Sequence, residues 1–316
     1  MKIPRIGRVA IVGAGTMGPK IAYRCVVHGI ECRLYDQSAQ ALAKAMDQIE
    51  QWLKEGLEQG RLTPDKAREA RTNLEPAPTL AQCVARADLV IETVPENIEL
   101  KRRVFSEIDG LAPQEALIAT NSSSLPCSRM AEATTRPEKV LNINFADPVH
   151  DFEVEIMKGS QTADQTLVAV ERFCRAMEMV PIVTMKEIMG FSFNRIWRAV
   201  KRESLHLVDQ GFSRFEEIDR AWILVFGTDF GPFGLMDMVG LDVVRDIEEQ
   251  YYLDSGQERD RPPKLLDRMI AQGRLGVKSG QGFYSYPDPD YRNPAWLHKK
   301  PPFDENLARV LGLKEE

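Results

Sequence analysis

A glycine-rich turn near the start of the chain limits the possible folds more than any other feature of the sequence. Residues 8–12 form a short β-branched apolar run, and Gly13, Gly15 and Gly18 follow it directly. A helix is expected after this turn, and residues 30–35 read as a second strand. Strand, tight turn, helix and strand in this order predict a βαβ unit with two parallel strands.

The spacing of the three glycines is typical of a turn that holds a dinucleotide. Gly13 permits the tight turn, Gly15 lets the backbone approach a pyrophosphate, and Gly18 lets the helix pack closely on the strand. The free N–H groups at the start of the helix favour the negative charge of the phosphates. We expect the cofactor-binding residues of this turn to be Gly13, Gly15, Thr16, Met17 and Gly18.

The second expected strand ends at an acidic residue, Asp36. Its carboxylate can accept hydrogen bonds from both hydroxyls of a ribose and would repel a 2′-phosphate. The glycine turn and Asp36 together therefore favour NAD over NADP as the cofactor. FAD is the main alternative, because FAD-binding proteins share the glycine pattern.

Strand-like and helix-like segments alternate through the first half of the chain. Further strands are expected at residues 89–94, 116–120, 139–145, 152–157 and 180–185, and helices at residues 38–59, 96–108 and 163–177. Thr63 and Pro64 have the pattern of an N-cap and a first-turn proline that open one more helix. This alternation predicts an α/β fold with a mainly parallel sheet covered on both faces.

After the last expected strand the sequence has helical periodicity alone. A long helix is expected over residues 191–209, and the segment from Ser213 to Glu216 has the form of a capping box that starts the next one. We therefore expect an α/β domain over residues 1–186 and an all-helical domain over residues 187–316. One small helical domain does not readily bury all of its apolar and aromatic residues, so we expect a homodimer through this region.

Composition argues against several other classes of protein. A net charge of −6 over 316 residues provides no basic face for nucleic acid, and no apolar run is long enough to span a membrane. The five cysteines include no C-x-x-C pair, and no cluster of residues has metal-ligand spacing, so we expect neither a disulfide framework nor a metal. The first strand begins too early to leave room for a signal peptide, which favours the cytoplasm.

Seven motifs stand in order along nearly the whole chain. They are GAGTMG at 13–18, DLVIE at 88–92, VPEN at 94–97, TNSSSL at 120–125, GFSFNR at 190–195, GPF at 231–233 and GVKSGQGFY at 276–284. In this respect the chain resembles the L-3-hydroxyacyl-CoA dehydrogenase family, which includes relatives that act on free hydroxy acids, such as the L-gulonate 3-dehydrogenase/λ-crystallin branch.

The resemblance implies a Rossmann-type domain followed by a helical dimerisation domain, with the active site between the two. It implies NAD-linked interconversion of a secondary alcohol and a ketone, and a role in fatty acid metabolism. By position, Glu96 and Lys101 would line the nicotinamide half of the cofactor site, and Lys278 would approach the cofactor. Ser123 would bond the substrate oxygen near the nicotinamide, and Asn194 would lie beside the substrate.

The chain departs from the family at the group that takes the proton of the substrate hydroxyl. The family has a His in a His-Phe-Phe-Asn-Pro motif, oriented by a Glu; here Asn144 stands at the His position and Glu155 at the Glu position. An amide is no base at neutral pH, and losing a general base typically costs about 10²–10⁴-fold in rate.

Three hypotheses follow from this departure. Another group takes the proton, with His150 and Asp147 the nearby candidates; Asp147, which replaces a family Asn, is also counted among the cofactor-binding residues. In the second hypothesis Asn144 positions an unusual substrate and water carries the proton. In the third, the protein binds NAD without turnover, as a sensor, a scaffold or a crystallin-like protein.

A second departure concerns the substrate. By spacing from Asp36, the Ser and Lys with which the family binds the CoA tail correspond to Trp52 and Gln59, neither of which replaces the lysine charge. The small-molecule substrate is therefore either an acyl-CoA or a free hydroxy acid or aromatic alcohol. Trp52 could stack on a substrate ring, although a tryptophan beside an apolar stripe is more often packed in the core.

Overall fold

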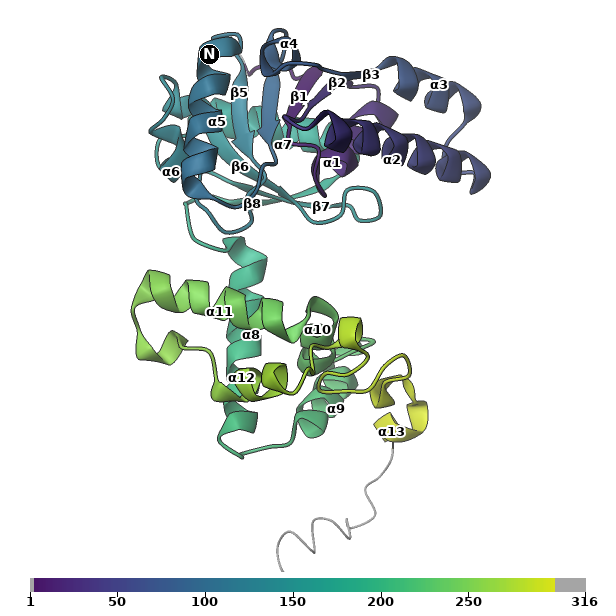
Figure 1. Ribbon diagram of the computed structural model, residues 1–316, viewed down its shortest axis with the longest axis vertical. Helices are drawn as coiled ribbons and strands as arrows, with labels where there is room; N and C mark the ends of the chain where they lie inside the picture. The colour runs from purple at the N-terminus through teal and green to yellow at the C-terminus, as the bar shows by residue number, and fades with distance from the viewer. Residues whose placement is uncertain (1–2, 299–316) are drawn as a thin grey trace, which may run out of the picture. The chain divides into compact units, whose positions relative to one another are not determined.

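The alternating first half of the chain forms an eight-stranded sheet of order β3-β2-β1-β4-β5-β6-β7-β8 (Figure 1). The computed structural model describes residues 3–298. The strands are β1 (Arg8–Val12), β2 (Glu31–Tyr35), β3 (Leu74–Pro76), β4 (Leu89–Glu92), β5 (Leu117–Thr120), β6 (Val140–Phe145), β7 (Glu153–Met157) and β8 (Val180–Thr184). All neighbours pair in parallel except β6 and β7, which are antiparallel. The predicted mainly parallel α/β sheet is confirmed.

Different helices cover the two faces of the sheet. The helices of this half are α1 (Gly18–Val27), α2 (Ala39–Glu58), α3 (Pro64–Thr72), α4 (Leu80–Val84), α5 (Ile98–Leu111), α6 (Ser128–Ala131) and α7 (Asp164–Ala176). Val9 and Ile11 of β1 belong to the core formed with α1, α2 and α7. Ala10 and Val12 belong to the core formed with α4, α5 and α6, because successive strand residues point to opposite faces.

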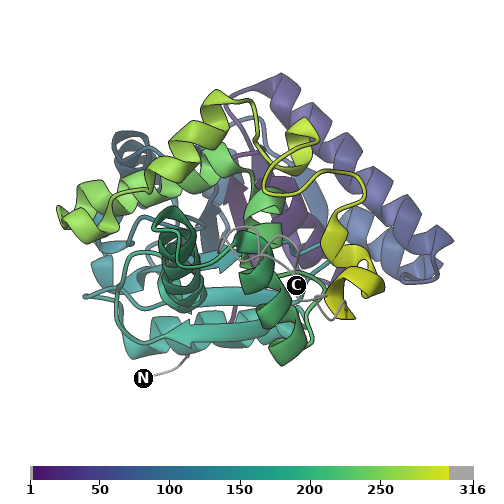
Figure 2. The ribbon, with the colours of Figure 1, turned by 90° about the horizontal axis from the view of Figure 1, so that it is seen from below.

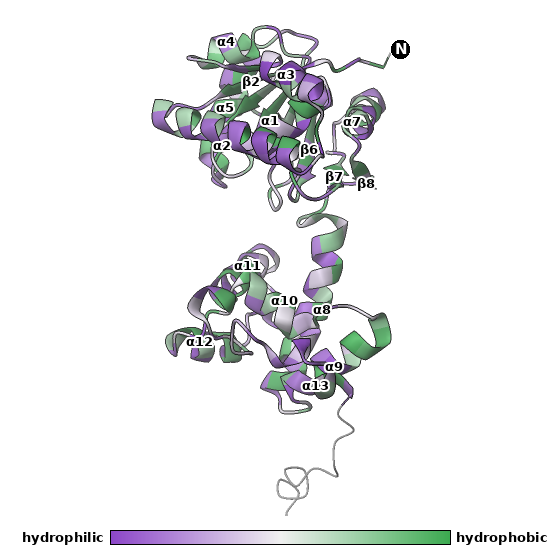
Figure 3. Cartoon of the chain, turned by 90° about the vertical axis from the view of Figure 1, so that its right-hand side faces the viewer, coloured by the Kyte–Doolittle hydropathy of each residue, from purple (hydrophilic) through white to green (hydrophobic). Residues whose placement is uncertain are grey.

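The helical pair α2 and α3 extends past the sheet edge at β3 (Figures 1 and 2). Thr63 caps α3 as predicted, since its hydroxyl accepts a hydrogen bond from the Lys66 amide at 3.3 Å. Hydrophilic and hydrophobic residues alternate along α2 (Figure 3). Half-buried Trp52 lies edge-on to Tyr23 of α1, with ring centroids 5.8 Å apart, and packs on the core, whereas Gln59 is exposed.

The second half of the chain is helical, as predicted. Its helices are α8 (Phe191–Asp209), α9 (Phe215–Phe226), α10 (Pro232–Val239), α11 (Leu241–Ser255), α12 (Lys264–Ala271) and α13 (Pro294–His298). By internal contacts the chain divides between Arg195 and Ile196, inside α8, into two compact units. The boundary expected near residues 186/187 stays a prediction. No helix among residues 3–298 is both long and apolar enough to cross a lipid bilayer.

The predicted capping box at Ser213 is wrong, although the helix that it was expected to start exists. The N-cap of α9 is Arg214, and no side chain caps this helix end. Because the helix begins one residue later than the box requires, Glu216 falls at the wrong position to complete it. The Ser213 hydroxyl instead donates to the Arg214 carbonyl at 3.4 Å.

Two fully buried carboxylates organise the core of the helical unit. Asp219 accepts hydrogen bonds from the amides of Phe233 and Gly234 at 2.8 and 2.9 Å, and from the Tyr284 hydroxyl at 3.1 Å. It thereby satisfies the free N–H groups at the start of α10. Asp237 accepts in the same way from the amides of the loop that follows α12. Burial raises the pKa of Asp219 to about 6, and the neighbouring Asp237 adds to this shift.

Candidate cofactor and substrate site

A cavity of about 900 Å³ lies at the carboxyl ends of β1, β2, β4, β5 and β6. The strand order reverses between β1 and β4, and ligands of open α/β sheets bind at such a point. The glycine turn and Asp36 line one part of the cavity, Glu96 and Lys101 another, and Ser123 and Asn144 a third. The fold therefore gathers at one cavity residues that are far apart in the sequence.

The three glycines of the turn meet different surroundings. Gly13 has a φ of +115°, and a Cβ there would lie 2.7 Å from the Thr93 hydroxyl oxygen. At Gly18 a Cβ would lie 1.9 Å from the Gly13 carbonyl oxygen. At Gly15 a Cβ would meet no atom within 4 Å, because this residue borders the cavity. The turn is thus tight at its ends and open at its centre, which fits a bound pyrophosphate. Thr16 and Met17 line the cavity beside Gly15.

Two backbone amides fix the carboxylate of Asp36 at the edge of the cavity. Its Oδ2 accepts from the Ala14 amide at 2.7 Å, inside the glycine turn, and its Oδ1 accepts from the Ser38 amide at 2.8 Å. A carboxylate offers about four acceptor positions, so both oxygens can also accept from ribose hydroxyls. Asp36 therefore fits the ribose-binding position of an NAD site.

The Lys101 ammonium is buried between two carboxylates. Its Nζ lies 2.8 Å from Glu92 Oε1 and 3.2 Å from Glu96 Oε2, while the lysine side chain is only 1% exposed. Glu92 is fully buried and also accepts from the Thr120 hydroxyl at 2.7 Å. Burial raises the pKa of Glu92. Burial also acts to raise the pKa of Glu96, but hydrogen bonds from neighbouring serines and from Lys101 outweigh it and lower that pKa.

The serines that follow β5 have separate environments. The hydroxyls of Ser122 and Ser124 both donate to Glu96 Oε1. Ser123 is exposed and lines the cavity, and no hydrogen bond of its hydroxyl is found within residues 3–298. Of the three, Ser123 thus has the hydroxyl that is free to bind a ligand.

Asn144 lies at the end of β6, opposite Glu155 of β7. Its Nδ2 donates to Glu155 Oε2 at 3.3 Å, and Asn144 lines the cavity. Glu155 is buried, and its other oxygen, Oε1, accepts from the Phe193 amide at 3.2 Å. Burial raises the pKa of Glu155.

Six predicted site residues lie outside the lining of this cavity: Gly18 and Glu155, described above, and the four that follow. Asp147 pairs with Lys20 of α1 at 3.0 Å, and His150 is exposed in the turn after it. Asn194 lies in the first turn of α8. Lys278 belongs to the helical unit, where its Nζ donates to Asp242 at 2.6 Å.

Sequence reasoning missed Glu92, which pairs with Lys101, and Thr120, whose hydroxyl donates to Glu92. A signal for Glu92 exists: it ends a run of buried apolar residues in β4, and a buried acid requires a partner. Sequence reasoning also missed Arg103 and Glu107, exposed residues of α5 that line the cavity. No comparable sequence pattern marks Arg103 and Glu107.

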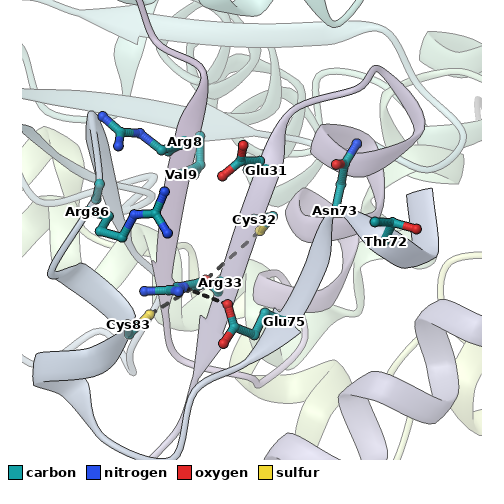
Figure 4. A pocket seen from close by; sticks show the side chains of 11 residues that line it. Arg8, Val9, Glu31, Cys32, Arg33, Thr72, Asn73, Glu75, Cys83 and Arg86 are labelled. Carbon is teal, nitrogen blue, oxygen red and sulfur yellow. Dashed lines mark hydrogen bonds and ion pairs between the residues drawn. The ribbon is translucent and has the colours of Figure 1, made fainter. Parts of the chain in front are cut away.

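A second cavity, of about 240 Å³, lies near the amino ends of β1 and β2 (Figure 4). Arg33 extends into it and pairs with Glu75 at 2.8 Å, and Arg8 at its edge pairs with Asp88 at 2.7 Å. Because these guanidinium groups are already neutralised, the second cavity has the character of a structural ion-pair region. The dinucleotide-type cavity is the candidate functional site.

The sheet order, the glycine turn and Asp36 define a Rossmann-type dinucleotide-binding protein that carries an additional helical domain. Residues 8–188 match the NAD-binding domain of 3-hydroxyacyl-CoA dehydrogenases, and residues 190–286 match their C-terminal domain. The chain belongs to the 3-hydroxyacyl-CoA dehydrogenase family. It is an NAD-dependent oxidoreductase of this type, with NAD as its cofactor.

Relatives with different named activities match most of the chain. A probable 3-hydroxybutyryl-CoA dehydrogenase of Bacillus subtilis is 31% identical over 89% of this chain and 98% of its own length. The 5-formyl-3-hydroxy-2-methylpyridine 4-carboxylate 5-dehydrogenase of Mesorhizobium japonicum is 31% identical over 89% of this chain and 91% of its own. The crystal structure of (S)-3-hydroxybutyryl-CoA dehydrogenase from Ralstonia eutropha has a TM-score of 0.83 at 33% identity, over 90% of this chain and 100% of that one.

Proposed function

We propose that the cavity is the site where this protein interconverts a secondary alcohol and a ketone, with Ser123 and Asn144 holding the reacting oxygen of the substrate. One observation carries the proposal: the same cavity is lined by the glycine turn, by Asp36 and by this pair of neutral polar side chains. When NAD is bound there, it accepts the hydride from the carbon that bears the hydroxyl. Gly13, Gly15, Gly18 and Asp36 would hold it.

Glu155 sets the orientation of the Asn144 amide. A carboxylate only accepts hydrogen bonds, so it must face the Nδ2 group of Asn144. Among residues 3–298 no hydrogen bond to the carbonyl oxygen Oδ1 is found, so this oxygen can accept from a substrate hydroxyl. Ser123 can donate to the same substrate oxygen. The pair thus binds the alcohol without adding charge, and the Ser123 hydroxyl can still donate to the oxygen of the ketone.

We infer that Asn144 stands where the family has its catalytic His and that water takes the hydroxyl proton. Asp147 is neutralised by Lys20, and His150 lies outside the cavity lining, which counts against either as the base. The carboxylate of Glu96 is engaged by two serines and a lysine, which makes it a weak base. The reaction is then slower than with a general base, by about 10²–10⁴-fold.

We propose a free hydroxy acid or an aromatic alcohol as the substrate rather than a CoA thioester. The packing of Trp52 against Tyr23 and the absence of a lysine at Gln59 support this choice. A relative named for a pyridine carboxylate indicates that the family is not restricted to CoA thioesters. A role in fatty acid metabolism would instead require that acyl-CoA substrates are turned over.

A screen of 3-hydroxyacyl-CoAs, free hydroxy acids and aromatic alcohols with NAD, followed by NADH absorbance, tests the function. We expect turnover of a non-CoA alcohol that is reduced but still measurable in Ser123→Ala. Turnover of acyl-CoAs alone would contradict the proposed substrate.

The second candidate, an NAD-binding protein without turnover, is favoured by the lack of a histidine in the cavity lining of residues 3–298. It predicts NAD binding by calorimetry with no activity on any compound.

We further infer a homodimer formed through the helical unit, in the reducing environment of the cytoplasm. Large apolar side chains are exposed on this unit, among them Leu224, Val225, Phe226, Val243 and Ile247. Exposed large apolar side chains become an interaction surface where they adjoin one another. Light scattering of the purified chain is expected to give twice the 35.7 kDa monomer mass. A monomer at micromolar concentration would contradict the inference.

A further inference from the structure

Three consecutive serines follow β5, and the structure distinguishes among them. Ser122 is buried, and its hydroxyl donates to Glu96 Oε1, while Ser124 donates to the same oxygen at 2.6 Å. The Leu125 amide donates in turn to the Ser122 hydroxyl oxygen at 2.8 Å. Residues 122, 124 and 125 are thereby connected to one carboxylate, whereas Ser123 between them is exposed in the cavity lining.

The other carboxylate oxygen of Glu96 is held by an ion pair with a buried lysine. Its Oε2 lies 3.2 Å from the ammonium of Lys101, which is buried and which Glu92 contacts with both oxygens, at 2.8 and 3.1 Å. Glu92 is held by the Thr120 hydroxyl at 2.7 Å and the Val94 amide at 2.6 Å. A chain of charged contacts therefore runs from the end of β4 to the serine loop.

The charges explain why the serines donate to Glu96 rather than accept from it. Two carboxylates share one ammonium, so Glu96 has acceptor capacity that Lys101 does not use. An ionised carboxylate accepts hydrogen bonds and cannot donate. The hydroxyl hydrogens of Ser122 and Ser124 must therefore point toward Glu96, and hydrogen bonds to a charged group are stronger than neutral ones.

We propose that Glu96, anchored through Lys101 to Glu92, is a positioning residue that orders the 121–125 loop and leaves Ser123 as the serine of the cavity lining whose hydroxyl is not bonded to Glu96. Ser122 and Ser124 are the two attachment points of this loop. The consequence for catalysis rests on the proposed function, because it assumes that Ser123 contacts the substrate. The ordering of the loop is independent of that assumption.

The deciding variant is Ser122→Ala/Ser124→Ala, which removes both attachment points and leaves Ser123, Glu96 and Lys101 in place. Hydrogen exchange of the purified full-length protein, read by mass spectrometry, reports on the loop without any substrate. We expect exchange in residues 121–125 to accelerate by about tenfold or more, since each lost bond is to a charged acceptor. Ser124→Thr keeps a hydroxyl and, in the Ser122 wild-type background, is expected to keep the slow exchange.

Glu99→Gln is the matched control, because Glu99 is an exposed carboxylate of the same helix, α5, and its ion-pair partner among residues 3–298 is Arg102. It is expected to leave exchange in the loop unchanged. Equal exchange rates in wild type and in Ser122→Ala/Ser124→Ala would overturn the proposal. So would an acceleration spread over the whole α/β unit, which would indicate general destabilisation.

Kinetics separate this proposal from the proposed function. On a substrate that is turned over, we expect Ser122→Ala/Ser124→Ala to lower kcat by about tenfold, with the Kd for NAD within about twofold of wild type. Adding these changes to Ser123→Ala should lower kcat no further, because the loop acts through Ser123. Fully additive losses would overturn the positioning role. If Ser123→Ala alone changes nothing while exchange accelerates, the substrate role of Ser123 fails and the ordering of the loop stands.

Discussion

Asn144 and Glu155 face each other across the antiparallel pairing of β6 and β7, and the amide nitrogen Nδ2 of Asn144 lies 3.3 Å from Glu155 Oε2. Glu155 is buried, and burial raises the pKa of its carboxyl. The pair consists of a buried acceptor and a side chain that donates an N–H to it. This geometry suits any donor that can occupy position 144, including an imidazole.

Replacing Asn144 by His should therefore create a general base that Glu155 already orients. We expect Asn144→His to raise kcat for alcohol oxidation by about 10²–10⁴-fold, the usual contribution of a general base. The gain should appear above the ordinary pKa of histidine, about 6.5, since the base must be neutral. Initial rates of NADH formation across pH 5–9 check this expectation.

Two companion variants control this experiment. Asn144→Gln changes the side chain without adding a base and should give no gain. Asn144→His/Glu155→Gln keeps the imidazole and removes its charged partner, so most of the gain should disappear. A protein in which Asn144→His is no faster than wild type would indicate that proton transfer does not limit the rate at this cavity.

Gly15→Ala and Gly18→Ala should separate cofactor binding from folding. A methyl group on Gly15 meets no protein atom within 4 Å but enters the cavity, whereas a methyl group on Gly18 would lie 1.9 Å from the Gly13 carbonyl oxygen. We expect Gly15→Ala to change the free energy of unfolding by less than about 0.5 kcal/mol and to weaken NAD binding at least tenfold. Gly18→Ala should cost about 1–3 kcal/mol of stability.

Calorimetric titration with NAD and urea denaturation of both variants provide the two measurements. Undiminished NAD affinity in Gly15→Ala would contradict the assignment of this turn to the pyrophosphate.

Asp36→Asn tests the ribose-binding role of the carboxylate. The amide keeps one acceptor oxygen for the Ala14 amide or the Ser38 amide, but it loses the charge and half of the acceptor capacity. We expect the Kd for NAD to rise by about tenfold or more, as for loss of a hydrogen bond to a charged group. The preference for NAD over NADP should shrink, because the repulsion of a 2′-phosphate is gone.

Titration with both cofactors gives the ratio of the two Kd values. Asp47→Asn is the control, since Asp47 is exposed on α2 and is not part of the cavity lining. An unchanged ratio in Asp36→Asn would mean that Asp36 does not contact the ribose.

The stability of the helical unit should depend on the ionisation of Asp219. Burial raises the pKa of this carboxyl to about 6 in the folded protein, above its ordinary value of 3.8. The folded state therefore binds the proton of Asp219 more tightly than the unfolded state does. The stabilisation that results is present at low pH and is lost as pH rises from about 4 to 6. A shift of this size corresponds to about 3 kcal/mol.

Thermal unfolding of wild type and Asp219→Asn between pH 4 and 7 measures this contribution. The asparagine cannot titrate, so its stability should fall less steeply with rising pH, even if the variant is less stable throughout. Parallel curves for the two proteins would show that Asp219 does not titrate in this range.

Most elements of the fold follow from short-range patterns. The glycine turn, the alternating strands and helices and the Thr63 cap were predictable because each depends on residues within one turn or one strand. The Ser213 capping box was predicted wrongly because tertiary packing, and not the local pattern, decides at which residue this helix starts. A shift of one residue in the helix start removes the box.

The sequence by itself determined the class of fold, the dinucleotide turn and the acid that accompanies it, since local spacing and hydrophobic periodicity specify them. Tertiary structure alone decided that Ser122 and Ser124 bond to Glu96, that Lys101 is buried between Glu92 and Glu96, and that Trp52 packs on Tyr23. The bonds from the serines to Glu96 join residues 26 and 28 positions apart. Such partners depend on which strands lie side by side in the sheet, and no local pattern encodes that order.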